Sequence, residues 1–466
     1  MGTRVESASN TRTSPRIEEV KHGIPHRASV LTWLPRRPQP VLLALAAPAL
    51  EVPNPPAPAP RRPRRRIRIA ALVLALPLGL VATDVGLGLL WLDTEAYDGP
   101  PVPPFTIRDN PRLAEWFEWQ EHLRSNAGPG GYRSNYDREL GWTSHPRPAS
   151  RKTQKYLAAI NSIGARSTRE YEPEVPEGKL RLLCFGDSFT YGSEAEDGEE
   201  WCAQLETLAP DVEAVNFGHP GYGLDQALLC YRRKREELEA DVVVIGIQVE
   251  ALPRVVTRCR SIEFPLAAML CVKPRFLLVD DELQLVPLPF PDAEALYQCA
   301  KAGELPATLA EHEYWSGDEP LFSFSNFARL RAAYAAQERR SYPRLWEARR
   351  EEPYRVLTEV LWTFREEAFE HGAKEVLVMI FPNHRDLGFR GPRGVRFLRF
   401  FRADLDERGV EVLDFDVIFE RRMRRGRKSL FLRNHFNPKA NRRVAEILLD
   451  WVRAHPVLGA AGGDGE

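Results

Sequence analysis

The chain of 466 residues has no excess of charge of either sign, since its formal net charge is −1. That balance gives no argument for nucleic-acid binding, which depends on basic surfaces that meet phosphates. The sequence also has no Cys-x-x-Cys pair and no G-x-x-x-x-G-K-[ST] loop. Neither a zinc site nor nucleotide hydrolysis is therefore indicated, and we expect no metal and no cofactor.

Charged residues are scarce over residues 67–92, where only Arg68, Thr83 and Asp84 interrupt an apolar run. A membrane-spanning helix needs about 20 such residues. The run predicts one transmembrane helix; a buried helix of a soluble protein and a cleaved signal peptide are the alternatives. The arginines of residues 61–66 precede it, which predicts a cytoplasmic amino terminus and a globular domain outside the cytoplasmic membrane of a bacterial envelope.

Composition divides the remaining sequence into segments. Residues 1–66 are rich in proline and arginine and are expected to be disordered. Residues 93–131 are expected to form a juxtamembrane linker, and residues 132–456 a globular domain. Within this domain, residues 255–350 are punctuated irregularly, which indicates an insertion that caps one edge of the sheet. Residues 457–466 are expected to be a disordered tail.

Short apolar runs alternate with helical patterns along the globular domain. This alternation predicts a parallel sheet with helices on both faces. The expected strands are 181–185, 212–217, 241–248, 375–381 and 410–414. The expected helices are 197–208, 224–239, 354–371, 396–408 and 440–453.

The sequence C-F-G-D-S-F-T-Y-G at residues 184–192 ends the first of these strands. Gly186 permits a sharp turn, and Ser188 then begins a helix, whose N-terminal N–H groups favour developing negative charge. An ordinary N-capping serine would give the same local pattern. Because a strand end in an open α/β sheet is also where ligands bind, Ser188 is a candidate nucleophile.

Two later motifs provide possible partners for this serine. The glycine-rich loop N-F-G-H-P-G-Y-G contains Gly221, and its unobstructed N–H groups could contribute to an oxyanion hole. His435 lies in F-L-R-N-H-F-N-P, immediately before the last predicted helix. A glycine turn and a surface histidine would be the ordinary interpretations of each motif taken separately.

In this order the three motifs resemble those of the SGNH hydrolases, also called the GDSL lipase/acylhydrolase family, over residues 132–456. The N-S-I-G-A-R sequence of residues 161–166 is similar to the approach segment of membrane-anchored members. The resemblance implies a three-layer αβα sandwich with a parallel, flavodoxin-like sheet. It also implies that Ser188 is the nucleophile, that His435 is the general base, and that the N–H groups of Ser188 and Gly221 hold the oxyanion.

The chain departs from the family at the strand of residues 241–248. Family members place an asparagine after this strand, which donates an N–H to the oxyanion. The position corresponds to Glu250 under the longer spacing, which we prefer, and to Gln248 under the shorter one. An ionised glutamate only accepts hydrogen bonds. Two substitutes remain open, namely a protonated Glu250 that donates or an amide supplied by Gln248.

The second departure lies beside the histidine. The family places an aspartate three residues before it to orient the ring, and here that residue is Leu432. Leucine can neither orient nor stabilise an imidazolium. Asp187, Asp414 and Asp416 are the carboxylates that we consider as support, and a Ser–His dyad held by a backbone carbonyl is the alternative.

We therefore expect a membrane-anchored serine esterase or deacetylase that acts on an ester-bearing glycan or lipid of the envelope. A catalytically weakened binding or assembly module and an O-acyltransferase are the alternatives. All six cysteines follow residue 92, and an oxidising compartment permits disulfides. Cys259 and Cys271 flank a loop and form the first candidate pair.

Overall fold

The computed structural model describes residues 64–92, 135–148, 158–260, 271–315, 324–339, 341–383, 398–424 and 429–458. The expectations for residues 1–63, all of the linker 93–131 and most of the tail 457–466 lie outside these ranges. Ahead of the globular part, α1 (Arg64–Leu87) contains Pro77 and continues into a π-helical turn, Gly88–Leu92. No helix among the described residues has both the length and the apolar character to span a membrane.

Five parallel strands form the central sheet in the order β4-β3-β5-β8-β9. Their bounds are β3 Leu180–Phe185, β4 Val212–Asn216, β5 Val242–Ile247, β8 Glu375–Ile380 and β9 Glu411–Asp414. All five strands expected from the sequence are confirmed. The chain passes from β3 to β4 on one side and then to β5 on the other. The direction in which successive strands are added to the sheet therefore reverses at β3. Ligands of open α/β sheets bind at such a point, outside the carboxyl ends of the strands.

The two faces of the sheet belong to two separate apolar clusters. Along β3, Leu183 and Phe185 face one cluster, and Leu182 and Cys184 face the other. This alternation follows from the two-residue period of a strand. Because both faces of the parallel sheet are covered, its strands are almost continuously apolar.

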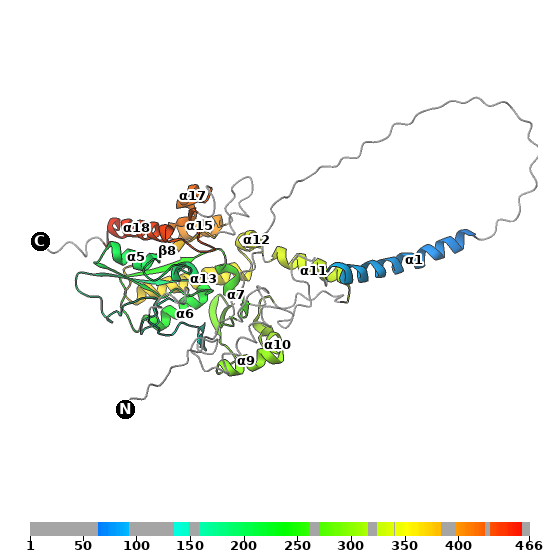
Figure 1. Cartoon of the computed structure of the whole chain (residues 1–466), viewed down its shortest axis with the longest axis horizontal. Helices are drawn as coiled ribbons and strands as arrows, with labels where there is room; N and C mark the ends of the chain where they lie inside the picture. Colours follow the sequence, from blue (N-terminus) through cyan, green and yellow to red (C-terminus); the bar gives the residue numbers. More distant parts are fainter. Residues whose placement is uncertain are drawn as a thin grey trace, which may run out of the picture. The chain divides into compact units, whose positions relative to one another are not determined.

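Helices cover each face, as the alternating pattern predicts. On one side lie α6 (Leu224–Lys234), α7 (Ala251–Val256) and α13 (Glu352–Glu370). On the other lie α5 (Trp201–Leu208), α16 (Phe415–Ile418) and α18 (Pro438–Ala454). Figure 1 shows α5 and α18 on the side of the sheet opposite α6. Two further helices are α15 (Arg399–Glu407) and α17 (Glu420–Arg424).

The expected insertion contains small elements of its own. A hairpin of β6 (Arg275–Val279) and β7 (Glu282–Val286) is followed by α9 (Ala293–Ala302), α10 (Leu305–Leu309) and a 3₁₀ turn, Ala310–His312. Then come α11 (Asn326–Arg339) and α12 (Tyr342–Glu347). Near the start of the domain, β1 (Tyr136–Asp137) pairs with β2 (Gly141–Trp142). A third apolar cluster joins α9 and α10 to Val272 and Phe290.

All six cysteines are free thiols in the structure. The disulfide considered between Cys259 and Cys271 is therefore not formed. The two residues lie next to each other in the backbone, since Cys259 pairs with Val272 in an isolated bridge and the N–H of Arg260 donates to the carbonyl of Cys271. The hydrogen bonds of these two chain segments, rather than a covalent link, close this loop.

A buried histidine fixes the loop that follows β4. The Nδ1–H of His219 donates to the carbonyl of Phe217 (3.1 Å), and Nε2 accepts the N–H of Ser144 (3.1 Å). The ring also stacks on Tyr222 at a centroid distance of 4.5 Å. Burial outweighs the hydrogen bond to Phe217 and lowers the pKa of His219 to about 4, so the folded protein holds the neutral ring.

We predict that this histidine weakens folding in acid. The unfolded chain takes up a proton on it below pH 6.5, the ordinary value, whereas the folded chain does so only near pH 4. Its stabilising contribution, on the order of 3 kcal/mol, is present above pH 6.5 and is lost as the pH falls toward about 4. Urea unfolding of the wild type and His219→Gln, at about pH 7 and about pH 5, should show a smaller pH dependence in the variant.

His145→Gln is the matched control, because His145 is exposed in the segment that also contains Ser144. This variant should keep the pH dependence of the wild type. An equal pH dependence in His219→Gln and the wild type would contradict the prediction.

Candidate functional site

The turn after β3 places Ser188 at the first position of α4 (Ser188–Tyr191). Gly186 adopts φ +153°, and a Cβ atom there would lie 2.8 Å from the carbonyl oxygen of Gly246, so the turn requires glycine. Asp187 caps α4, since Oδ1 accepts the N–H of Phe189 at 2.9 Å. Ser188 is thus fixed at the carboxyl edge of the sheet.

A tight turn before α18 presents His435 to this serine. Phe431 and Phe436 pair as an isolated bridge, and the N–H of Leu432 donates to the carbonyl of His435 at 3.0 Å. The structure brings the two sequence-predicted residues together, since Nε2 of His435 lies 2.8 Å from Oγ of Ser188. This is the separation at which a base accepts the proton of a nucleophilic hydroxyl.

The carboxylate beside His435 is Glu194, which we did not single out in the sequence. Its Oε1 lies 3.5 Å from Nδ1 of the ring, a separation longer than a well-formed hydrogen bond. Oε2 accepts the N–H groups of Arg433 (3.0 Å) and Asn434 (3.2 Å). Burial opposes ionisation, but His435 and these two donors outweigh it and lower the pKa of Glu194 to about 2.

Glu194 lies in the loop that follows α4 and has a left-handed backbone, with φ +71°. Such a conformation is costly for a residue other than glycine and persists only where the surroundings impose it. The run of acidic residues at 194–200 is the only signal of this position in the sequence. That run does not indicate which carboxylate faces the histidine.

Arg166, the last residue of the approach segment, holds this loop in place. The residue is buried, and its two terminal nitrogens donate to four backbone carbonyl oxygens of the loop, those of Tyr191 (2.7 Å), Gly192 (2.6 Å), Ala195 (2.8 Å) and Glu196 (3.4 Å). The guanidinium also lies over the ring of Tyr191 at 4.7 Å. The bonded carbonyls flank Glu194 on both sides, so a single cation fixes the loop that carries it.

The structure places the sequence-predicted candidates Asp414 and Asp416 elsewhere. Asp414 caps α16, where Oδ1 accepts the N–H of Val417 at 3.0 Å, and it also pairs with Arg402. Asp416 accepts from Nη2 of Arg402 at 2.8 Å. The strand end of β9 therefore directs both carboxylates to this arginine, whereas Glu194 is the carboxylate beside His435.

A buried polar network surrounds Asp187. Its Oδ2 accepts from Nε2 of Gln248 (2.7 Å) and from Nη1 of Arg254 (3.0 Å). Arg254 also pairs with Glu250, and Nδ2 of Asn383 donates to Oε1 of Gln248 at 2.8 Å. An arginine partner favours the ionised carboxylate, which opposes the idea that a neutral Glu250 donates to an oxyanion. Gln248 directs its amide toward Asp187.

Gly221 lies at the turn of the glycine-rich loop with φ +84°. The guanidinium of Arg260 lies close to this glycine. A Cβ atom at position 221 would lie 2.7 Å from Nη1 of Arg260 and 3.5 Å from Cζ2 of Trp142. The left-handed backbone is what favours glycine here, since the guanidinium is the far end of a flexible side chain.

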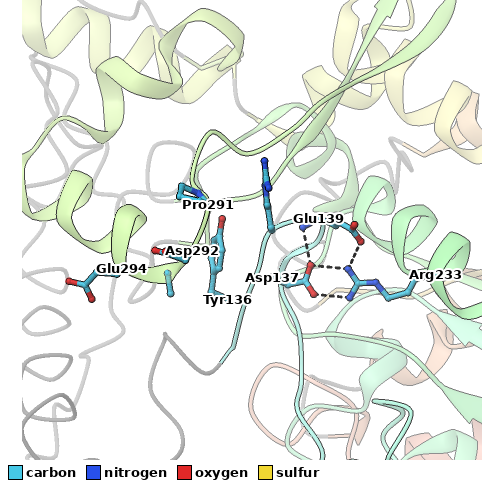
Figure 2. Close-up of a pocket in the computed structure, with 9 residues that line it drawn as sticks. Tyr136, Asp137, Glu139, Arg233, Pro291, Asp292 and Glu294 are labelled. Atoms are coloured by element: carbon cyan, nitrogen blue, oxygen red, sulfur yellow. Dashed lines mark hydrogen bonds and ion pairs between the residues drawn. The ribbon is translucent and has the colours of Figure 1, made fainter.

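The described residues contain no group of three or more His, Cys, Asp and Glu side chains that could hold a metal ion. A cavity of about 870 Å³ lies away from Ser188 and His435, lined by residues 136–139, 291–294 and Arg233. Figure 2 shows that Arg233 faces Asp137 and Glu139, with Nη1 2.7 Å from Asp137 and Nη2 2.8 Å from Glu139. Arg233 is thus paired with two of the carboxylates that line this cavity.

Comparison with known proteins gives only distant likenesses. No protein-family model and no curated protein matches the chain. Among solved structures, a member of the lipolytic G-D-S-L family from Veillonella parvula is similar at 13% identity and a TM-score of 0.30, over 58% of this chain and 97% of that one. An alpha/beta hydrolase enzyme from the metagenome of Lake Arreo is similar at 13% identity and a TM-score of 0.32, over 59% and 96%. Such slight likenesses carry no functional argument.

We predict that Arg166→Met opens the Glu194 loop. Leaving the bound carbonyls without a donor should lower the free energy of unfolding by about 3–5 kcal/mol, as when one partner of a buried charged contact is removed. Urea unfolding measures the loss. In native-state hydrogen exchange, the amides of residues 192–197 should exchange faster in the variant than in the wild type, whereas the amides of β5 should be less affected.

Arg169→Met is the matched control, since the side chain of Arg169 is 40% exposed and pairs with Glu206 and Glu213. It should cost only about 1 kcal/mol and leave exchange in the Glu194 loop unchanged. Equal losses in the two variants would contradict the role assigned to Arg166.

Proposed function

We propose that the chain is a serine hydrolase that cleaves ester bonds through an acyl-enzyme on Ser188. The observation that carries this proposal is the series of contacts from Oγ of Ser188 to Nε2 of His435 (2.8 Å) and from Nδ1 of His435 to Oε1 of Glu194 (3.5 Å). A nucleophile, a base and a carboxylate in this order form the arrangement that activates a serine.

In the proposed reaction, Oγ of Ser188 attacks the ester carbonyl while Nε2 of His435 accepts its proton. Glu194, ionised because its pKa is about 2, stabilises the imidazolium that forms. The N–H groups of Ser188 and Gly221 hold the negative oxygen of the tetrahedral intermediate. His435 then protonates the leaving alcohol. Water attacks the acyl-enzyme while His435 accepts its proton, and return of this proton to Oγ of Ser188 releases the acid.

Transfer of the acyl group to a second hydroxyl is the same chemistry with another acceptor, so an O-acyltransferase stays an alternative. The ester-bearing glycan or lipid substrate stays a prediction, as do the membrane anchor and the site outside the cytoplasmic membrane. A weakened binding or assembly module was favoured by Leu432 and Glu250 alone. The contact between Glu194 and His435 favours the enzyme, since it provides a carboxylate that Leu432 does not.

The proposal predicts that a fluorophosphonate probe labels the full-length protein and that Ser188→Ala abolishes labelling. His435→Gln should slow labelling by about 10²–10⁴-fold, because the serine loses its base. Gel fluorescence or intact mass measures the adduct. Ser193→Ala, a serine in the loop after α4, should label as the wild type does. A folded wild-type protein that is not labelled would rule out the proposed function.

A second prediction concerns Glu194→Gln, which keeps the shape of the side chain and removes its charge. We expect kcat for p-nitrophenyl acetate to fall by about 10²–10⁴-fold. Since the pKa of Glu194 is about 2, the carboxylate is ionised at about pH 8, where the loss is to be measured. Glu196→Gln, an exposed glutamate in the same loop, is the control and should keep full activity.

A further inference from the structure

Arg260 lies beside the glycine whose N–H is expected to hold the oxyanion. Its Nη1 would be 2.7 Å from a Cβ atom at Gly221, and its Nη2 is 3.6 Å from Oε2 of Glu250. The side chain is 25% exposed. Over the part of the chain that the structure describes, its guanidinium has this one ion pair and no hydrogen bond, so N–H groups remain available to a substrate.

Glu250 takes the asparagine position under the longer spacing that we prefer, and its carboxylate explains why Arg260 lies there. Its carboxylate accepts from Arg254, lies 3.4 Å from Nδ2 of Asn383 and attracts Arg260. A neutral asparagine would donate to the oxyanion but would not hold a guanidinium. The substitution therefore removes one N–H donor from this edge of the sheet and places a cationic donor against Gly221.

The amides nearby each direct an N–H group into the network. Nε2 of Gln248 donates to Asp187 at 2.7 Å, and Nδ2 of Asn383 donates to Gln248 at 2.8 Å. Arg254 is buried and donates to Asp187 and to the carbonyl of Tyr222, each at 3.0 Å. Of these side chains, only that of Arg260 is both cationic and partly exposed.

We propose that Arg260 is an oxyanion-stabilising residue, whose guanidinium donates to the substrate oxygen as negative charge develops and replaces the family's asparagine. A hydrogen bond from a charged donor is about twice as strong as one from a neutral amide. The guanidinium also stays protonated at every working pH. This inference rests on the proposed function, since it assigns a donor for the same tetrahedral intermediate.

The test compares Arg260→Ala and Arg260→Lys with the full-length wild type, using p-nitrophenyl acetate. Loss of one oxyanion donor should lower kcat by about 10²–10³-fold while KM stays within about twofold, because the contact forms only in the transition state. Arg260→Lys keeps the charge but not the fork geometry, so its kcat should lie between those of the wild type and Arg260→Ala. Added guanidinium should restore part of the activity of Arg260→Ala and none to the wild type.

Arg138→Ala is the matched control, since Arg138 is an exposed arginine that lines the cavity of Figure 2. It should keep wild-type kcat and should not respond to guanidinium. Unchanged kcat in Arg260→Ala, or a raised KM with unchanged kcat, would overturn the inference and leave the hydrolase proposal intact. A wild type that neither turns over the ester nor reacts with fluorophosphonate would overturn the hydrolase proposal itself.

Urea unfolding checks that each variant is folded. If Arg260→Ala is not folded, the kcat and KM of Arg260→Lys decide the question by the same criteria.

Discussion

The site depends on the hydrogen bonds that the buried carboxylate of Asp187 accepts. One oxygen caps α4 and so fixes the backbone of Ser188, while the other joins the turn to Gln248 after β5 and to Arg254 on α7. A charge in such surroundings is tolerated only when it is paired and hydrogen-bonded. The position of the nucleophile and the arrangement of the polar network are therefore set by the same group.

The features that could be predicted are those that local sequence determines. The five strands follow from short apolar runs, and the meeting of Ser188 with His435 follows from motifs at the strand ends and before the last helix. Glu194 could not be found in this way, because its left-handed backbone is imposed by Arg166, which is distant in sequence. Nothing in the pattern of residues 194–200 distinguishes that one carboxylate from its neighbours.

Glu250 shows the same limit in another form. From the sequence, and only through the resemblance, it is expected to be a lost oxyanion donor. In the structure it is the shared partner of Arg254 and Arg260, and one of these guanidinium groups lies against Gly221. The effect of the substitution thus depends on side chains from α7 and the segment after it, whose approach is a property of the tertiary packing.

The carboxylate beside His435 lies on the segment that follows the nucleophile, and this placement determines how the site is assembled. Glu194 contacts the ring of His435 and also accepts the N–H groups of Arg433 and Asn434. The same side chain therefore docks the turn that carries His435 and orients its ring. Because α4 begins at Ser188 and the loop that follows it carries Glu194, His435 meets both partners when this turn docks. An aspartate next to the histidine would orient the ring without holding the two segments together.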